Sequence, residues 1–210
     1  MAVGRAVLPP MGNAVKSMPL RVAADCMPRV IALCGRAGAG KDLVAAMLHM
    51  RGYERIAFAD PLRDEVRSAI ASHTIPMGAP IMVEATIRAG DCAAVDRKPT
   101  SDMMRYTLQW WGKEYRRDRD GEDYWVSRLS QRMRPSGKYV ITDCRFPNEL
   151  AFARKQGGVV WRIERDVAVG GIPGHASETA LANVQADAVI RNHGSLHELA
   201  VKVRKELDRC

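Results

Sequence analysis

The sequence predicts an α/β fold, a three-layer sandwich in which helices cover both faces of a five-stranded parallel sheet. Two observations lead to this prediction. Short apolar segments of strand length alternate with longer segments whose apolar residues recur at helical spacing, from residue 30 to the C-terminus. A glycine-rich turn at residues 35–40 joins the first strand-like segment to the first helix-like one. This alternation is typical of a parallel, doubly wound sheet.

The glycine-rich turn has the spacing of a P-loop. After the apolar segment Val30–Cys34, residues 35–42 read GRAGAGKD, which fits the pattern G-x-x-x-x-G-K. Backbone N–H groups of such a turn, together with the positive end of the following helix dipole, form a cradle for phosphate. A glycine-rich turn without a chemical role is the alternative, but the strand, the lysine and the helix together favour a nucleotide-binding site. The predicted phosphate-binding residues are Gly35, Gly38, Gly40, Lys41 and Asp42, the last standing where a Ser or Thr usually meets Mg²⁺.

Composition limits the class of protein. The chain has 210 residues, 47% of them hydrophobic, and a net charge of +8. This length suits one α/β core with a small inserted subdomain, and no apolar run is long enough to span a membrane. Five cysteines without a C-x-x-C pair indicate neither a zinc site nor a disulfide framework, so a cytoplasmic location is expected. The positive charge suits nucleic acid, a nucleotide carrying several phosphates, or a merely solvated surface; the P-loop favours the nucleotide.

We expect a loose arm at residues 1–26, or a start codon placed too early, followed by one domain at residues 27–210. Within the domain, residues 73–100 contain three prolines and two glycines and predict an irregular connection. An acceptor-binding helical insertion is expected at about 73–134 and a lid loop at about 164–177. Strands are expected at 30–34, 54–58, 138–142, 159–163 and 188–190; helices are expected after Lys41, from Pro61, from Ser101 to Arg116, after Gly121, from Pro147, and after a capping box at Ser195 and Glu198.

Several polar residues follow predicted strands, at the sheet edge where ligands bind in open α/β folds. Asp60 and Arg63 lie where the second strand meets a helix, although a surface turn with a capping carboxylate is also compatible with the pattern. Asp143 ends an apolar strand downstream of the P-loop and resembles a Walker B aspartate, which holds Mg²⁺ or its waters. Arg162 and Arg165 precede a glycine-rich loop that suits a lid over phosphates, or an ordinary surface loop.

The helix from Ser101 carries two stripes. One stripe is apolar and should face the core: Met104, Leu108, Trp111 and Tyr115. The neighbouring stripe could receive a phosphate and a base, or form a solvated face: Arg105, Gln109, Gly112 and Arg116.

Together these segments resemble one family, the bacteriophage deoxynucleoside monophosphate kinases, from about Pro28 to the C-terminus. The resemblance is carried by Gly40–Asp42, Ala59–Arg63, Leu108–Glu114, Trp125, Asp143–Glu149, His175–Glu178 and the turn at Asn192. It implies that Asp42 is an accepted variant, and that Leu43 and Lys113 stand where the family commonly has threonine. It further implies an acceptor nucleotide against Leu62, Arg63, Arg105, Gly112, Lys113, Trp125, Asp143, Arg145 and Glu149.

The reaction that follows is transfer of the γ-phosphoryl group of ATP to a deoxynucleoside monophosphate. Lys41, Arg105, Asp143 and Arg145 are the expected catalytic residues. ATP is expected at Gly35, Gly38, Gly40, Lys41, Asp42, Leu43, Arg162, Arg165 and Asn192, with Mg²⁺ at Asp42 and Asp143. The monophosphate is expected at Asp60, Leu62, Arg63, Arg105, Gln109, Gly112, Lys113, Arg116, Trp125, Asp143, Arg145 and Glu149, with Trp125 packing on the base.

Two other readings stay open at this point. Another small-molecule P-loop kinase, such as a dephospho-coenzyme A kinase, has a similar topology but a different acceptor. A non-enzymatic module that binds nucleotides or nucleic acid would use the positive charge and the tryptophans instead. The arginines recur at acceptor-facing positions rather than in one basic run, so we do not expect a specific nucleic-acid partner. Because no apolar run is long enough to span a membrane, we do not expect a membrane partner either. A homodimer is one open assembly state, and the location is the host cytoplasm if the chain is phage-encoded.

Overall fold

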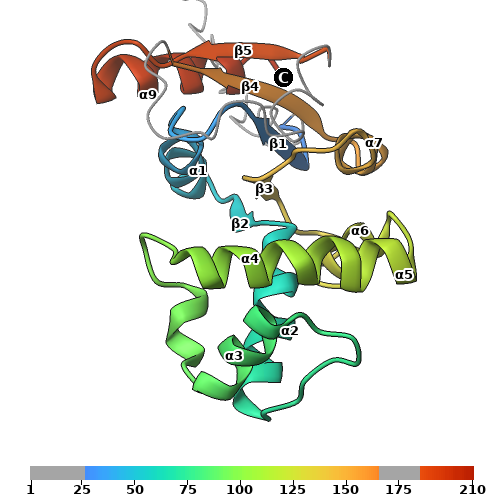
Figure 1. Ribbon diagram of the computed structural model, residues 1–210. Helices are drawn as coiled ribbons and strands as arrows, with labels where there is room; N and C mark the ends of the chain where they lie inside the picture. The colour runs from blue at the N-terminus through green and yellow to red at the C-terminus, as the bar shows by residue number, and fades with distance from the viewer. Residues whose placement is uncertain (1–26, 166–184) are drawn as a thin grey trace, which may run out of the picture.

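The computed structural model describes residues 27–165 and 185–210. The expected arm at 1–26 lies outside these residues, as does the expected lid from residue 166 onward. The described strands are β1 (Val30–Cys34), β2 (Glu54–Ile56), β3 (Tyr139–Ile141), β4 (Val159–Glu164) and β5 (Ala188–Arg191). They form one parallel sheet in the order β2-β3-β1-β4-β5 (Figure 1). The predicted five-stranded parallel sheet is therefore confirmed.

Helices cover both faces of this sheet, and strand residues alternate between the two covers. One face, including Ile31 and Leu33, packs against α1 (Lys41–His49) and α9 (Leu196–Leu207). The other face, including Val30 and Ala32, packs against α7 (Pro147–Lys155) and Leu129. Strand β1 is therefore buried on both faces, and this explains why its sequence is apolar at every position instead of at every second one.

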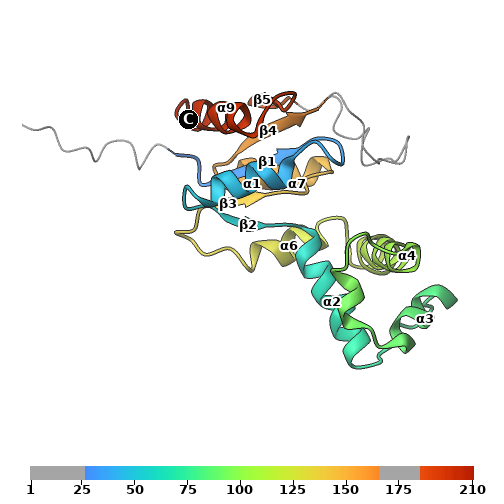
Figure 2. The same ribbon diagram turned by 90° about the vertical axis from the view of Figure 1, so that its left-hand side faces the viewer.

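The remaining helices form a second cluster beside edge strand β2 (Figures 1 and 2). They are α2 (Ala59–Ala71), α3 (Ile81–Ala89), the 3₁₀-helix η1 (Cys92–Val95), α4 (Asp102–Trp110), the π-helix η2 (Trp111–Arg117), α5 (Asp118–Asp120) and α6 (Tyr124–Ser130). We call this cluster the helical unit. Its own core includes Val66, Ile87, Met104, Trp111 and Trp125, so α2 packs with the insertion that was expected to begin only at about residue 73.

The expectation of an irregular connection over 73–100 is wrong. This segment contains α3 and η1, and Val83 and Ile87 on α3 are completely buried. The prolines and glycines mark the ends of the helix rather than breaking it. Pro80 is the N-terminal cap, and Gly90 adopts a left-handed conformation (φ 70°) just past the C-terminus.

Two predicted elements are shorter than expected. The strand predicted at 54–58 ends at Ile56, because carboxylates replace the neighbouring strand as hydrogen-bond partners. Asp60 accepts the N–H of Ala57, and Asp143 accepts those of Phe58 and Ala59, where α2 begins. The helix predicted from Ser101 to Arg116 is α-helical only to Trp110 and continues as the π-helix η2.

Candidate functional site

The P-loop has the tight conformation that its glycines predict. Gly35, Gly38 and Gly40 all have positive φ, at 137°, 77° and 100°. A Cβ atom at Gly35 would lie 2.2 Å from the carbonyl oxygen of Ile163, and one at Gly40 would lie 2.4 Å from Nδ2 of Asn192. Only glycine is compatible with these two positions, because both the backbone conformation and the space exclude a side chain.

Lys41, the first residue of α1, folds back over this loop. Its Nζ donates hydrogen bonds to the carbonyls of Gly35 (2.8 Å) and Arg36 (2.9 Å). Burial and the positive charge of Arg145 lower the pKa of the Lys41 amine. Lys41 and Arg145, which follow the paired strands β1 and β3, are therefore close enough for the charge of Arg145 to act on the lysine.

The other residues expected around ATP lie close to the loop or at its rim. Asn192, which is buried, donates from Nδ2 to the carbonyl of Ala39 at 2.9 Å and so ties the turn after β5 to the P-loop. Asp42 and Leu43 are exposed in the first turn of α1. Arg162 lies on β4 beside Cys34; burial raises the pKa of the Cys34 thiol, while Arg162 opposes that rise. Arg165 is exposed at the end of the described segment.

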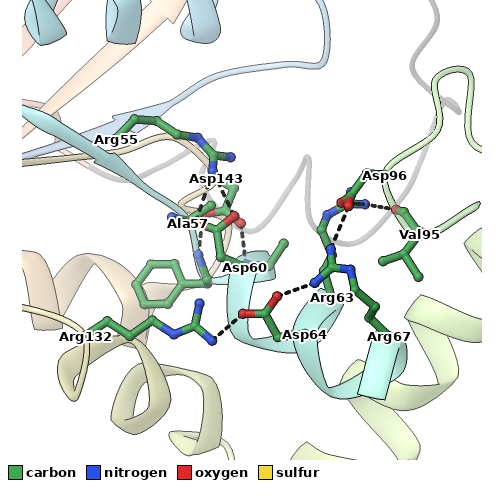
Figure 3. A network of polar contacts seen from close by, with 12 residues as sticks. Arg55, Ala57, Asp60, Arg63, Asp64, Arg67, Val95, Asp96, Arg132 and Asp143 are labelled. Carbon is green, nitrogen blue, oxygen red and sulfur yellow. Dashed lines mark hydrogen bonds and ion pairs between the residues drawn. The ribbon is translucent and has the colours of Figure 1, made fainter. Parts of the chain in front are cut away.

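Asp143 follows β3, the strand paired with β1. Its two oxygens accept the backbone N–H groups of Phe58 and Ala59, each at 2.8 Å, at the start of α2 (Figure 3). Burial raises the pKa of this carboxyl, and the two N–H groups and Arg145 oppose the rise. The carboxylate thus joins the sheet to the helical unit, and only its remaining lone pairs are available to a ligand.

Arg145 is exposed on the loop between β3 and α7, and Glu149 holds that loop from inside. Glu149 Oε2 accepts the N–H groups of Arg145 (2.7 Å) and Phe146 (3.1 Å). Its Oε1 accepts a hydrogen bond from Arg117 at 2.8 Å. Burial raises the pKa of Glu149 to about 7. Oε2 of Glu149, a residue expected to touch the acceptor, therefore holds the backbone of this loop, while its Oε1 is bound to the Arg117 side chain.

The polar stripe expected on the helix from Ser101 is interrupted by η2. Arg105 and Gln109 lie exposed on α4. The wider turn of a π-helix changes the face on which later residues lie, and the structure does not bring Arg116 together with Arg105. Arg116 instead donates to Glu65 (2.8 Å) and Asp120 (3.0 Å).

Glu65 also accepts hydrogen bonds from Trp111 Nε1 (3.1 Å) and the Tyr124 hydroxyl (2.5 Å). It lines a cavity of about 390 Å³ between α2, η2 and α6, together with Arg116, Arg128 and Arg132. The charged groups of this cavity pair with one another: Arg116 and Arg128 with Glu65, and Arg132 with Asp64. Arg116 is thus part of a structural network of the helical unit.

Three residues expected to face the acceptor, Gly112, Leu62 and Trp125, pack against one another in this structure. A Cβ atom on Gly112 would lie 3.3 Å from Cδ2 of Leu62, and Trp125 Nε1 donates to the Gly112 carbonyl at 2.9 Å. Trp125 is only 3% exposed, in the core of the helical unit. The expectation that Trp125 packs on a base is therefore not met in this structure, which presents no open face of its indole.

The charged residues at the start of α2 belong to two separate groups of ion pairs (Figure 3). Asp60 pairs with Arg55 at 2.8 Å. Arg63 donates to the carbonyl of Val95 and lies 3.8 Å from Asp96. Lys113, exposed on η2, belongs to neither group and pairs with Asp118 at 3.1 Å. Asp60 and Arg63 thus shape the connection between β2 and the helical unit.

Sequence reasoning missed Arg117, which lies between the helical unit and the loop that carries Arg145. Its guanidinium also lies 4.0 Å from the centre of the Phe146 ring. No periodic signal could have found it, because helical spacing placed Arg116, not Arg117, on the polar stripe, and the π-helix is not visible in the sequence.

The described residues contain no group of three or more His, Cys, Asp or Glu side chains that could hold a metal ion by themselves. A magnesium ion that arrives with a nucleotide needs fewer protein ligands, since it usually binds one or two carboxylates, phosphates and several waters. Asp42, exposed in the first turn after the P-loop, fits such a role, and Asp143 has lone pairs left for a bound water.

A parallel sheet with a P-loop turn after its central strand is the three-layer fold that the sequence predicted. Residues 102–203, from α4 into α9, match the family model described as "Deoxynucleotide monophosphate kinase". Over these residues, the resemblance to deoxynucleoside monophosphate kinases that the sequence suggested is thereby confirmed. The match supports a nucleotide kinase, and hence a phosphotransferase, as the class of protein.

Solved structures with a similar arrangement include two other kinases. A dephospho-CoA kinase from Campylobacter jejuni is 12% identical, with a TM-score of 0.46, over 86% of this chain and 96% of that one. A gluconokinase from Sinorhizobium meliloti 1021 is 15% identical, with a TM-score of 0.43, over 87% and 93% of the two chains. The comparison with curated proteins finds no match. Over residues 27–165 and 185–210, none of the helices has the length and apolar character required to cross a membrane.

Proposed function

We propose that the protein is an ATP-dependent deoxynucleoside monophosphate kinase, which transfers the γ-phosphoryl group of ATP to a deoxynucleoside monophosphate to give the diphosphate. The observation that carries this proposal is that Lys41 and Arg145 lie at the same edge of the sheet. They follow the adjacent parallel strands β1 and β3, and the charge of Arg145 acts on the Lys41 amine. Two cations at one sheet edge suit a reaction in which two anionic groups must approach each other.

The donor would bind on the P-loop. Backbone N–H groups of residues 35–40 and the N-terminus of α1 provide the phosphate cradle, and the Lys41 amine would exchange the carbonyls of Gly35 and Arg36 for oxygens of the β- and γ-phosphates. Asn192 supports this loop from the turn after β5. Asp42, with Asp143 through water, would hold Mg²⁺. That ion would neutralise charge on the phosphates when bound.

The acceptor would bind on the side of the helical unit. Arg145, from the loop after β3, and Arg105, from α4, would bind the monophosphate, since the planar guanidinium group matches phosphate oxygens in a bidentate way. Both side chains are exposed, and the ion pair of Arg105 with Asp102 is long, at 3.8 Å. These arginines can therefore turn to a ligand at small cost. Transfer then depends on positioning and on positive charge where the transition state spreads its negative charge.

An acceptor panel tests the proposal. Purified full-length protein with Mg²⁺ and ATP is incubated with each common ribo- and deoxyribonucleoside monophosphate, and with dephospho-coenzyme A and gluconate as controls. We expect ADP formation and a labelled diphosphate product with at least one deoxynucleoside monophosphate. Transfer to dephospho-coenzyme A or gluconate alone, or no transfer to any nucleoside monophosphate, would contradict it.

A further inference from the structure

Arg117 connects the helical unit to the loop that carries Arg145. It is the last residue of η2, and its guanidinium donates to Oε1 of Glu149 on α7 at 2.8 Å. The same group lies over the ring of Phe146, 4.0 Å from its centre. The two charged side chains are 11% and 3% exposed, so the pair is almost completely removed from water.

The contact continues from Glu149 to the backbone of Arg145. Oε2 of Glu149 accepts the N–H of Arg145 at 2.7 Å and that of Phe146 at 3.1 Å. One carboxylate therefore binds Arg117 with one oxygen and the Arg145 loop with the other. Because the φ and ψ angles of Arg145 set the direction in which its side chain leaves the loop, whatever fixes Glu149 also fixes that direction.

The π-helix explains why Arg117, rather than its neighbour, reaches this position. Arg116 binds Glu65 and Asp120 inside the helical unit. Arg117, one residue later, lies against α7 and the loop before it. A π-turn inside an α-helix frequently marks a functional position, and here it separates an arginine of the helical core from one that faces the catalytic sheet.

We propose that Arg117 is a positioning residue for phosphoryl transfer, which acts through Glu149 to orient Arg145 toward the acceptor phosphate. This inference rests on the proposed function. Removal of Arg117 leaves a buried carboxylate without its cation, an arrangement that a protein relieves by moving the group toward water. Glu149 would then release the N–H groups of Arg145 and Phe146. Lysine is a partial substitute, since it restores the charge but neither the forked geometry nor the stacking on Phe146.

The test combines amide hydrogen exchange with kinetics on the full chain. The variants are Arg117→Met, Arg117→Lys, Glu149→Gln and the double variant Arg117→Met/Glu149→Gln, with Arg119→Met as the matched control on exposed α5. In Arg117→Met we expect exchange at the amides of Arg145 and Phe146 to accelerate at least ~10-fold, with strand β1 amides unchanged. We expect kcat to fall on the order of 10- to 100-fold and the KM for the acceptor to rise, while the KM for ATP changes less than about twofold.

Two further results distinguish this positioning role from a general loss of structure. Arg117→Lys should recover part of both the amide protection and kcat. Because Arg117 acts through Glu149, adding Arg117→Met to Glu149→Gln should cost much less than the product of the two single losses. Unchanged amide exchange in Arg117→Met, or fully multiplicative losses in the double variant, would overturn the proposal.

The exchange measurement needs no substrate, so it separates this inference from the proposed function. If the wild-type protein transfers phosphate to no nucleoside monophosphate, the proposed function fails, and the exchange of the Arg145 amide still decides whether Arg117 holds this loop. If Arg117→Met does not fold, Arg117→Lys provides the same two measurements with the charge retained.

Discussion

Arg145 and Arg105 come from different parts of the molecule, and the fold holds them differently. The backbone of Arg145 is bound by the buried Glu149, whereas Arg105 stands on the exposed face of α4 with one long ion pair. If both bind the acceptor phosphate, Arg145→Ala and Arg105→Ala should each raise the KM for the monophosphate and lower kcat. Each charged contact is worth roughly 1.5–3 kcal/mol, which corresponds to losses on the order of 10- to 100-fold.

Steady-state kinetics with each substrate varied in turn check this prediction, and Arg154→Ala, on α7, is the control. The KM for ATP should change much less than the KM for the acceptor. A main effect on ATP in either variant would show that the acceptor lies elsewhere.

A second prediction at the scale of one residue follows from the raised pKa of Glu149. Burial raises that pKa from 4.5 to about 7, so the folded protein binds this proton more tightly than the unfolded chain does. This tighter proton binding adds to the free energy of unfolding. Its contribution is complete below pH 4.5 and is lost as the pH rises through 7. One pKa unit corresponds to about 1.4 kcal/mol, so the loss is on the order of a few kcal/mol.

Urea unfolding of wild type and of Glu149→Gln at pH 5 and pH 8 measures this effect. We expect the free energy of unfolding of the wild type to fall between these pH values by more than that of the variant. Glu206→Gln, on α9, should follow the wild type. An equal change in Glu149→Gln and wild type would be incompatible with a raised pKa at this position.

At this scale, the sequence predicted the residues whose roles follow from spacing and missed those that depend on tertiary contacts. The P-loop glycines and Lys41 could be predicted because a turn of this length constrains its own backbone. Arg117 could not, since its role depends on a π-helix and on Glu149, 32 residues later in the chain. The burial of the Trp125 indole could not be predicted for the same reason, because it depends on the packing of α6.

At the scale of elements, the helices were predicted best where apolar spacing and caps agreed. The capping box of Ser195 and Glu198 begins α9 as expected, and Pro147 opens α7. Helix α3 was missed because the prolines and glycines around it were interpreted as a sign of irregular structure throughout. Strand β2 was predicted too long, since its end depends on carboxylates of Asp60 and Asp143 that a local pattern cannot place.

The packing of α3 on α4 leads to a prediction for these elements. The hydroxyls of Thr86 and Thr107 lie 2.9 Å apart, and both residues are buried. Replacement of one threonine by valine keeps the shape and leaves the other hydroxyl without this partner. Thr86→Val should therefore lower the free energy of unfolding by about 1 kcal/mol.

Denaturant unfolding of Thr86→Val, Thr107→Val and the double variant measures this coupling. The loss of stability in the double variant should be smaller than the sum of the losses in the two single variants, because no hydroxyl is then left without its partner. Additive losses would show that the hydroxyls do not stabilise the contact between α3 and α4.

At the scale of the whole molecule, the sheet has one hydrophobic cluster on each face, and the helical unit has a separate core. Alternation of strands and helices predicted the sheet, but not that α2 belongs to the helical unit. That boundary depends on which face of α2 is covered, and Val66 and Ile70 show it only in the folded chain. The proposed donor site lies on the sheet, and the proposed acceptor site lies where the sheet meets the helical unit.

Because the two proposed sites are separate, we predict that each substrate, added alone, stabilises the folded protein without the other. A ligand that binds only the folded state adds about 2.7 kcal/mol of stability at a concentration 100 times its Kd, so Mg²⁺-ATP and the monophosphate should each raise the Tm. Lys41→Ala removes the amine that would bind the donor phosphates. We expect this variant to lose most of the ATP-dependent rise in Tm, while it keeps the rise caused by the monophosphate. Its kcat should be lower than that of the wild type by more than about 100-fold.

Arg145→Ala should show the opposite pattern of Tm changes, and Lys155→Ala, exposed on α7, should respond as the wild type does. Thermal unfolding with each ligand alone is the measurement. A normal ATP response together with normal turnover in Lys41→Ala would contradict the assignment of the P-loop as the donor site.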